Sequence, residues 1–107
     1  MEPIPDHNNF YVMLRTSLSP EHVARIYEAL GWSIRMSSST DFEIRCPWAE
    51  LEIMTDGPIL LLNGAVAAVL ANAPRILQPL QDASIAYAGE CYGQDLALLQ
   101  EFAWPAK

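Results

Sequence analysis

Residues 42–62 read FEIRCPWAELEIMTDGPILLL and contain three predicted β-strands joined by two short turns. In the first two strands apolar and charged residues alternate, which is typical of strands that bury one face and expose the other. Pro47-Trp48 and Asp56-Gly57 supply the turns. The third strand, Ile59–Leu62, is apolar at every position, which predicts at least partial cover on both faces, and Asn63-Gly64 is expected to end it.

A two-residue turn at Pro47-Trp48 also fixes the register of the first hairpin. The pairs it predicts are Cys46 with Ala49, Arg45 with Glu50, Ile44 with Leu51 and Glu43 with Glu52. Arg45–Glu50 is a favourable pair, whereas Glu43–Glu52 opposes two like charges and costs roughly 0.2–1 kcal/mol. The free face of the predicted sheet therefore carries Glu43, Arg45, Glu50 and Glu52.

The residues before this hairpin predict a strand, a helix and a second strand. Residues 1–9 form an irregular lead-in, and Phe10–Ser17 is rich in β-forming residues. A helix begins after Ser19, because serine is a good N-cap and proline fits the first helical position. Its apolar stripe consists of Val23, Ile26, Tyr27 and Leu30, and Gly31 stands where a left-handed residue would end it. Trp32–Ser37 alternates as the next strand.

The C-terminal part of the chain predicts helix, strand and helix. Residues 65–81 are rich in alanine and leucine, but Pro74 and Pro79 predict two short pieces or a sharp kink near residues 72–74. Ser84–Ala88 is the next strand, with Tyr92 as its furthest end, and Gln94–Phe102 is predicted to close the chain as a helix. The expected fold is a single α+β domain with a mostly antiparallel sheet, the order β-α-β-β-β-β-α-β-α, and helices mainly on one face.

Charge and cysteine content exclude several classes of function. The 107 residues include 13 acidic and 6 basic side chains, a net charge of −7, and 51% are hydrophobic. Such a chain has enough apolar residues to fold but lacks the basic face that nucleic-acid binding requires, and anionic membranes would repel it. Two cysteines and an N-terminus without signal-peptide features predict a cytoplasmic protein with free thiols.

Two features of the sequence partly match catalytic or metal sites. Gly89-Glu90-Cys91-Tyr92-Gly93 matches the spacing of a nucleophile elbow, but no histidine follows it to act as the base. We therefore expect a glycine-flanked turn with an unreactive thiol. His7 and His22 are the only histidines and do not make a zinc site without further ligands. The sequence predicts no catalytic residue, metal or cofactor.

Residues 10–62 resemble one β-α-β-β-β module of the vicinal oxygen chelate superfamily, which includes glyoxalases and bleomycin-resistance proteins. Ser19-Pro20 opens the helix, and Ile26–Trp32 (IYEALGW) is similar to the F-Y-x-x-L-G-[FW] segment of that family. The metal ligand of the family's first strand falls near Val12, which cannot bind a metal. The alternative function is a small-molecule-binding domain of this half-module type without a metal, acting as a dimer that completes a cup between two sheets. Its expected lining residues are Trp32, Tyr87 and Tyr92, which lie in or near strands of a mostly apolar sheet.

The function we expect first is a non-enzymatic protein-binding module that covers a basic partner protein. Its acidity and small size are typical of bacterial immunity proteins and antitoxins, which neutralise a toxic enzyme. The expected site has Trp48 as an apolar anchor, with Trp104 as a second candidate. Its carboxylate acceptors for Arg or Lys are Glu43, Glu50, Glu52 and Asp56. A third alternative is an assembly subunit that buries residues 59–70 against a copy of itself.

Overall fold

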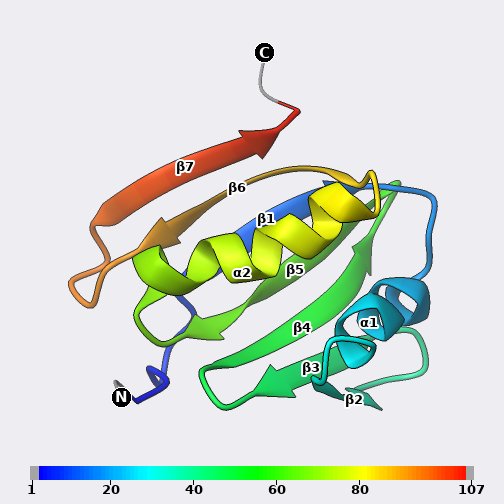
Figure 1. The fold of residues 1–107 in the computed structure, drawn as a ribbon, viewed down its shortest axis with the longest axis horizontal. Helices are drawn as coiled ribbons and strands as arrows, with labels where there is room; N and C mark the ends of the chain where they lie inside the picture. The colour runs from blue at the N-terminus through cyan, green and yellow to red at the C-terminus, as the bar shows by residue number, and fades with distance from the viewer. Residues whose placement is uncertain (1–2, 106–107) are drawn as a thin grey trace.

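The computed structural model describes residues 3–105, which form one seven-stranded antiparallel sheet and two helices (Figure 1). The strands run in the spatial order β2-β3-β4-β5-β1-β6-β7. Their bounds are β1 Phe10–Arg15, β2 Ser33–Met36, β3 Phe42–Cys46, β4 Ala49–Asp56, β5 Ile59–Val66, β6 Ala86–Tyr92 and β7 Leu98–Trp104. The helices are α1 Pro20–Glu28 and α2 Val69–Asp82. The predicted α+β class is confirmed. No helix among these residues is long and apolar enough to cross a membrane.

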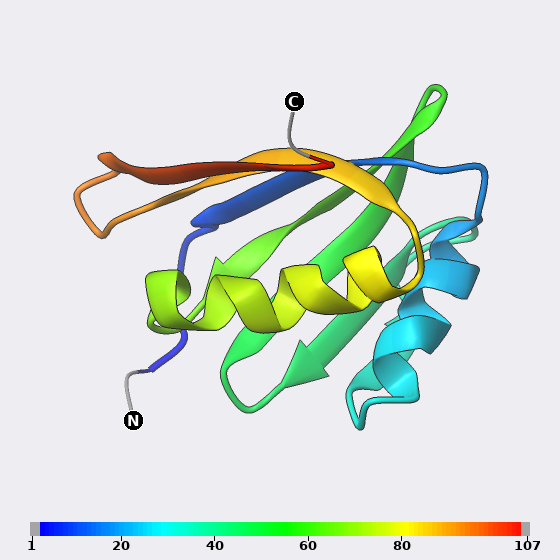
Figure 2. The same ribbon diagram turned by 45° about the horizontal axis from the view of Figure 1, so that its top comes forward.

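Both helices pack on the same face of the sheet, as Figure 2 shows, and the core lies between the two layers. Alternate residues of every central strand point into this core, as the period of a strand requires. The largest side chains that are fully buried there include Phe10, Leu14, Tyr27, Ile44, Ile53, Leu62, Ile76 and Leu80. The opposite face of the sheet is the one that α1 and α2 leave uncovered.

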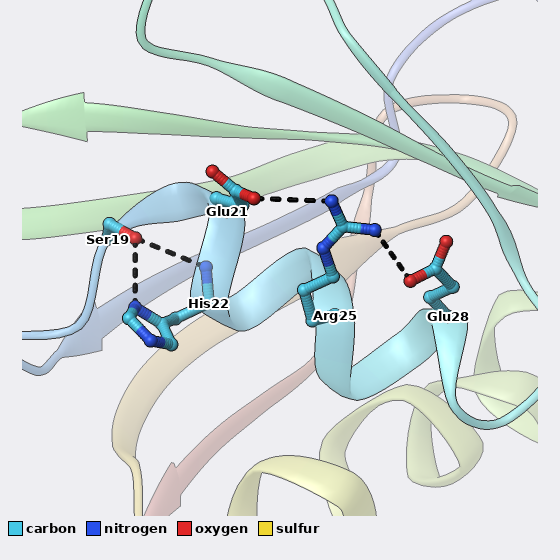
Figure 3. A network of polar contacts seen from close by, with 5 residues as sticks. All are labelled: Ser19, Glu21, His22, Arg25 and Glu28. Atoms are coloured by element: carbon cyan, nitrogen blue, oxygen red, sulfur yellow. Dashed lines mark hydrogen bonds and ion pairs between the residues drawn. The ribbon is translucent and has the colours of Figure 1, made fainter.

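The first helix begins after Ser19 and is followed by Gly31 as its sequence predicts, but Leu30, expected in its apolar stripe, lies beyond its end at Glu28 and keeps 60% of its surface exposed. The Ser19 hydroxyl accepts a hydrogen bond from the His22 backbone N–H at 3.2 Å and lies 3.2 Å from His22 Nδ1 (Figure 3). One turn later, Arg25 pairs with Glu21 at 3.2 Å and with Glu28 at 2.8 Å, along the exposed side of the helix. Gly31 follows the helix with φ of 100°, a conformation that glycine adopts without strain.

The hairpin of β3 and β4 has the register that its two-residue turn predicts. Cys46 lies opposite Ala49, Arg45 opposite Glu50, Ile44 opposite Leu51 and Glu43 opposite Glu52. The next turn also forms, one residue later than expected, at Gly57-Pro58: Asp56 pairs with Ile59, and Gly57 has φ of 60°. Local turn chemistry therefore determines how these three strands pair.

The expectation that Asn63-Gly64 ends the following strand is wrong, because β5 continues to Val66. Gly64 is paired on both sides, with Leu51 of β4 and Phe10 of β1. A Cβ atom at this position would lie 2.1 Å from the Glu50 carbonyl oxygen, so the close approach of β4 requires glycine. The Asn63 side chain also joins β5 to β1, since its Oδ1 accepts a hydrogen bond from the Val12 N–H at 3.3 Å.

The predicted break in the second helix is also wrong, because α2 is one helix with Pro74 and Pro79 inside it. Each proline lacks the N–H that would donate to the carbonyl four residues earlier. The carbonyls affected are those of Leu70 for Pro74 and Arg75 for Pro79. Both of these residues are exposed, so water can satisfy the two carbonyls. The cost is offset by the apolar side of α2, whose buried residues are Val69, Ala73, Ile76, Leu77 and Leu80.

The predicted closing helix, Gln94–Phe102, is wrong: the chain turns back at residues 94–97 and forms β7. The turn is tied by a bond from the Gly93 N–H to the Ala97 carbonyl at 2.9 Å, and Leu96 adopts φ of 66°. The side chains of Phe102 and Trp104, at alternate positions of β7, point inward. Phe102 packs against Phe10, and Trp104 packs against Tyr87. Leu98 and Phe102 are four residues apart, a spacing that fits the period of a strand as well as that of a helix. Pairing with β6 selects the strand. The element order is therefore β-α-β-β-β-β-α-β-β.

Candidate partner-binding face

Outward-pointing residues line up across the uncovered face of the sheet, because neighbouring strands are in register and alternate residues share a face. One line crosses all seven strands, and we call it the polar row. From β2 to β7 its members are Arg35, Glu43, Glu52, Asn63, Tyr11, Glu90 and Glu101, each paired with the next. With strands spaced by about 4.8 Å, the polar row extends over roughly 30 Å.

A second line, the apolar row, runs beside the first at a distance of two residues along each strand. It crosses five strands, from β4 to β7, and consists of Met54, Leu61, Met13, Ala88 and Ala103. Met13 keeps 44% of its surface exposed, and Tyr11 in the neighbouring polar row keeps 37%. The uncovered face therefore places a strip of exposed hydrocarbon directly beside a strip of charge.

The β2 end of the polar row contains its only base. Arg35 Nε pairs with a Glu43 carboxylate oxygen, and this hydrogen bond holds the pKa of Glu43 below its ordinary value. Glu52, the like-charged neighbour of Glu43, accepts a hydrogen bond from Ser37 Oγ at 2.8 Å. These contacts orient both carboxylates, and Glu52 has no ion-pair partner among residues 3–105.

The β7 end of the polar row combines two carboxylates with two tyrosines. Glu90 lies opposite Glu101 in the register, a second like-charged pair. A hydrogen bond with the Glu90 carboxylate, aided by partial burial, raises the pKa of Tyr92 to about 12. The rings of Tyr92 and Tyr11 meet edge to face, with centroids 5.8 Å apart. This end of the face therefore joins aromatic surface to negative charge.

A groove of about 610 Å³ follows the junction of β1, β6 and β7 on the uncovered face. Met13, Leu61 and Ala103 supply its apolar lining, and Tyr11, Glu90 and Glu101 supply its polar lining. Gly89 lies at its floor, where a Cβ atom would come within 2.2 Å of the Tyr11 carbonyl oxygen. The groove is a shape that suits an extended or amphipathic ligand with a positive charge.

The structure brings together four of the five site residues that the sequence predicts. Glu43 and Glu52 lie in the polar row, and Glu50 lies on the same face, exposed and opposite Arg45. Asp56 is exposed at the end of β4, beside the turn. These carboxylates come from neighbouring strands, as alternation and the first hairpin predict.

Trp48 does not lie with the carboxylates. It is half-buried on the helix-bearing side, where its ring meets buried Trp32 edge to face at 5.2 Å. The Arg75 guanidinium of α2 stands over the ring, 4.5 Å from its centroid, in a cation–π contact. Trp104, the second anchor candidate, also packs inward and stacks on Tyr87 at 6.4 Å. Neither tryptophan borders the polar row.

Several residues of this face were not predicted as site residues, among them Tyr11, Met13, Glu90 and Glu101. The alternation of Phe10–Arg15 carries a signal for the first two, since it places Tyr11 and Met13 on one side of a strand. Glu90 and Glu101 carry no such signal, because their pairing depends on β7, which the local pattern assigns to a helix.

The two cysteines have the properties of structural thiols. Cys91 is fully buried in the middle of the glycine-flanked motif, which lies within β6 and the residue after it and not in the expected turn. Burial raises the pKa of both Cys91 and Cys46, so neither thiol is activated as a nucleophile. Among residues 3–105, no group of three His, Cys, Asp or Glu side chains could hold a metal ion.

No family model, curated protein or solved structure matches this chain. The resemblance of residues 10–62 to the vicinal oxygen chelate superfamily thus gains no support from the comparison with family models. The functional assignment depends on the chemistry of the uncovered face.

Proposed function

We propose that this protein is a non-enzymatic binding module whose uncovered sheet face docks on a basic partner protein. The observation that carries the proposal is the pairing of the two rows: exposed hydrocarbon beside four glutamates, on the face opposite both helices. An apolar strip supplies the area that loses water on binding, and the charges beside it orient the partner.

The charge of this face supports a basic partner. Six carboxylates and three guanidinium groups point outward from this face, which leaves an excess of three negative charges. The acids are Glu43, Glu50, Glu52, Asp56, Glu90 and Glu101, and the bases are Arg15, Arg35 and Arg45. Within residues 3–105, Glu43 is the only one of the six in an ion pair. The other five can accept Arg or Lys from a partner and speed its approach.

The type of module we infer is that of a bacterial immunity protein or antitoxin, which blocks a basic enzyme by covering the surface that binds its substrate. A net charge of −7 gives the chain the sign that such an enzyme's substrate site attracts. We place the protein in the cytoplasm, where its two free thiols, Cys46 and Cys91, would stay reduced.

The test is a pair of matched double variants. Affinity capture from source lysate, at low and high salt, first supplies the partner protein. Glu43→Gln/Glu52→Gln removes two charges from the uncovered face, and Glu21→Gln/Glu28→Gln removes two from α1, on the opposite side. The face variant should weaken partner binding at low salt by about fivefold or more and reduce its salt dependence. The α1 variant should bind within about twofold of the parent protein.

Calorimetry on both variants, each checked for folding by circular dichroism, separates the outcomes. Equal weakening by the two variants would mean that only net charge matters and would overturn the assignment to this face. Unchanged binding by the face variant would overturn it as well.

A second candidate function, small-molecule binding by a dimer, is favoured by the groove of about 610 Å³, a volume usual for ligand sites. Its expected lining changes: Trp32 and Tyr87 are buried in the core, at 8% and 6% exposure, and only Tyr92 stays near the uncovered face. Sedimentation separates the two functions, because two sheets that complete one cup must form a dimer.

A further inference from the structure

The outer edge of β7 is unpaired in the part of the chain that the structure describes, since β7 ends the strand order. The edge is seven residues long and contains one charge, Glu101. Leu98 and Leu99 at its start keep 49% and 43% of their surface exposed. Proteins usually shorten such an edge, charge it or cover it, because its free backbone groups bind other strands. The opposite edge, β2, fits that rule with only four residues and Arg35 among them.

The backbone groups that β7 offers can be identified from the neighbouring strands. The Tyr92 N–H donates to the Asn9 carbonyl on the β1 side, at 2.9 Å, so Cys91, Gly89 and Tyr87 direct their groups toward β7. Their partners in the register are Gln100, Phe102 and Trp104. Glu101 and Ala103, between those partners, therefore direct their N–H and C=O groups outward.

The same two residues end the rows of the uncovered face. Glu101 is the last member of the polar row and Ala103 the last of the apolar row. A strand added to this edge would extend both rows by one position. The residue of the added strand beside Glu101 would lie next to the negative charges of Glu101 and Glu90. The residue beside Ala103 would contact the apolar row.

We propose that β7 binds an extended basic segment of the partner as an eighth strand. The segment carries Lys or Arg opposite Glu101 and an apolar residue two positions away, opposite Ala103. This inference rests on the proposed function for the basic character of the partner, and it names the part of the partner that binds. Charge favours this occupant over a second copy of the chain, since two copies would bring two sets of Glu90 and Glu101 together, each on a molecule of net charge −7.

The probe is a labelled synthetic peptide, acetyl-Thr-Val-Thr-Lys-Thr-Val-Thr-amide, titrated with the full-length protein by fluorescence anisotropy. Its lysine has valine two positions away on both sides, so an antiparallel strand, the direction of every strand pair in this sheet, places a valine opposite Ala103. A peptide with Glu in place of Lys tests charge. A third peptide, N-methylated at the lysine and both valines, lacks the N–H donors that would pair with β7.

The protein variants are Ala103→Pro and its control Ala103→Val. The Ala103 N–H faces outward, so proline there removes a donor for the added strand and no bond within the sheet. Ala103→Pro should weaken binding of both the peptide and the intact partner at least about tenfold relative to Ala103→Val, which also enlarges the side chain but keeps the N–H. The Glu-containing and N-methylated peptides should bind at least about tenfold more weakly than the parent peptide.

Several results would overturn strand addition. One is that the N-methylated peptide binds as tightly as the parent peptide. This comparison uses the unaltered protein, so it does not depend on how Ala103→Pro folds. Another is the absence of binding by the parent peptide. A dimer that Ala103→Pro converts to monomer in sedimentation would assign the edge to a second copy. If Ala103→Pro keeps partner affinity while Glu43→Gln/Glu52→Gln loses it, the acidic face stands and the β7 inference fails; if both variants keep it, both fail.

Discussion

At the scale of single residues, one buried hydroxyl joins the two helices. Tyr27 of α1 is fully buried, and its hydroxyl donates to the Ile76 carbonyl of α2 at 2.6 Å. Burial raises the pKa of this phenol, with a smaller contribution from Tyr87, so the folded protein keeps it protonated. The helical periodicity of the sequence predicts Tyr27 in the core, but its partner lies 49 residues away and has no local signal.

Replacing Tyr27 by Phe should lower the free energy of unfolding by about 1 kcal/mol, because the Ile76 carbonyl loses a buried donor. Urea unfolding followed by circular dichroism measures this. Tyr11→Phe, which removes an exposed bond to the Asn8 carbonyl, is the control and should change stability by less than about 0.5 kcal/mol. Equal effects of the two substitutions would contradict the role of the interhelical bond.

The raised pKa of Tyr27 also gives a dependence on alkaline pH. The contribution is fully present below the unfolded-state pKa near 10 and is lost as pH rises above it, because only the unfolded chain then releases the proton. The parent protein should lose up to about 1.4 kcal/mol more per pH unit there than Tyr27→Phe. Urea titrations between pH 9 and 11 compare the two slopes, and parallel slopes would contradict the prediction.

At the scale of helices and strands, prediction from sequence worked where the determinants are local. Ser19, Pro20 and Gly31 define α1 by themselves, and Pro47-Trp48 defines the register that brings Glu43 beside Glu52. It failed where distant contacts decide. The buried side of α2 outweighs two prolines, and pairing with β6 selects a strand for residues 98–104. Because β7 was expected to be a helix, the sequence did not predict that Glu90 and Glu101 lie side by side at this end of the candidate site.

The glycines within β5 and β6 should be intolerant of even one added carbon. A Cβ at position 89 would lie 2.2 Å from the Tyr11 carbonyl oxygen and 2.8 Å from Val12 Cα, both backbone atoms that cannot move aside. Gly89→Ala should therefore lower the free energy of unfolding by about 3 kcal/mol. The control is Gly93→Ala, whose Cβ would meet only side-chain atoms, at 3.2 Å or more. Urea midpoints within error of one another would show that β1 and β6 can separate to admit the methyl group.

At the scale of the whole molecule, excess negative charge should limit both stability and self-association. Seven unbalanced negative charges repel one another within a small volume, and salt screens that repulsion. We expect the urea midpoint to rise as sodium chloride increases from about 10 mM to 0.5 M, with the protein monomeric in sedimentation at both salt concentrations. A midpoint that falls with salt would mean that ion pairs such as Arg35–Glu43 outweigh the repulsion.

The two rows of the uncovered face have a consequence for how this surface could evolve. Each row takes a single residue from each strand that it crosses, and the residues on either side of Met13 and of Glu52 are buried in the core. A mutation at Glu52, Met13 or Glu90 can thus alter what the surface recognises while the packing beneath the helices stays the same. Under the proposed function, partner choice and folding depend on alternate positions of the same strands, so a lineage can change one without sacrificing the other.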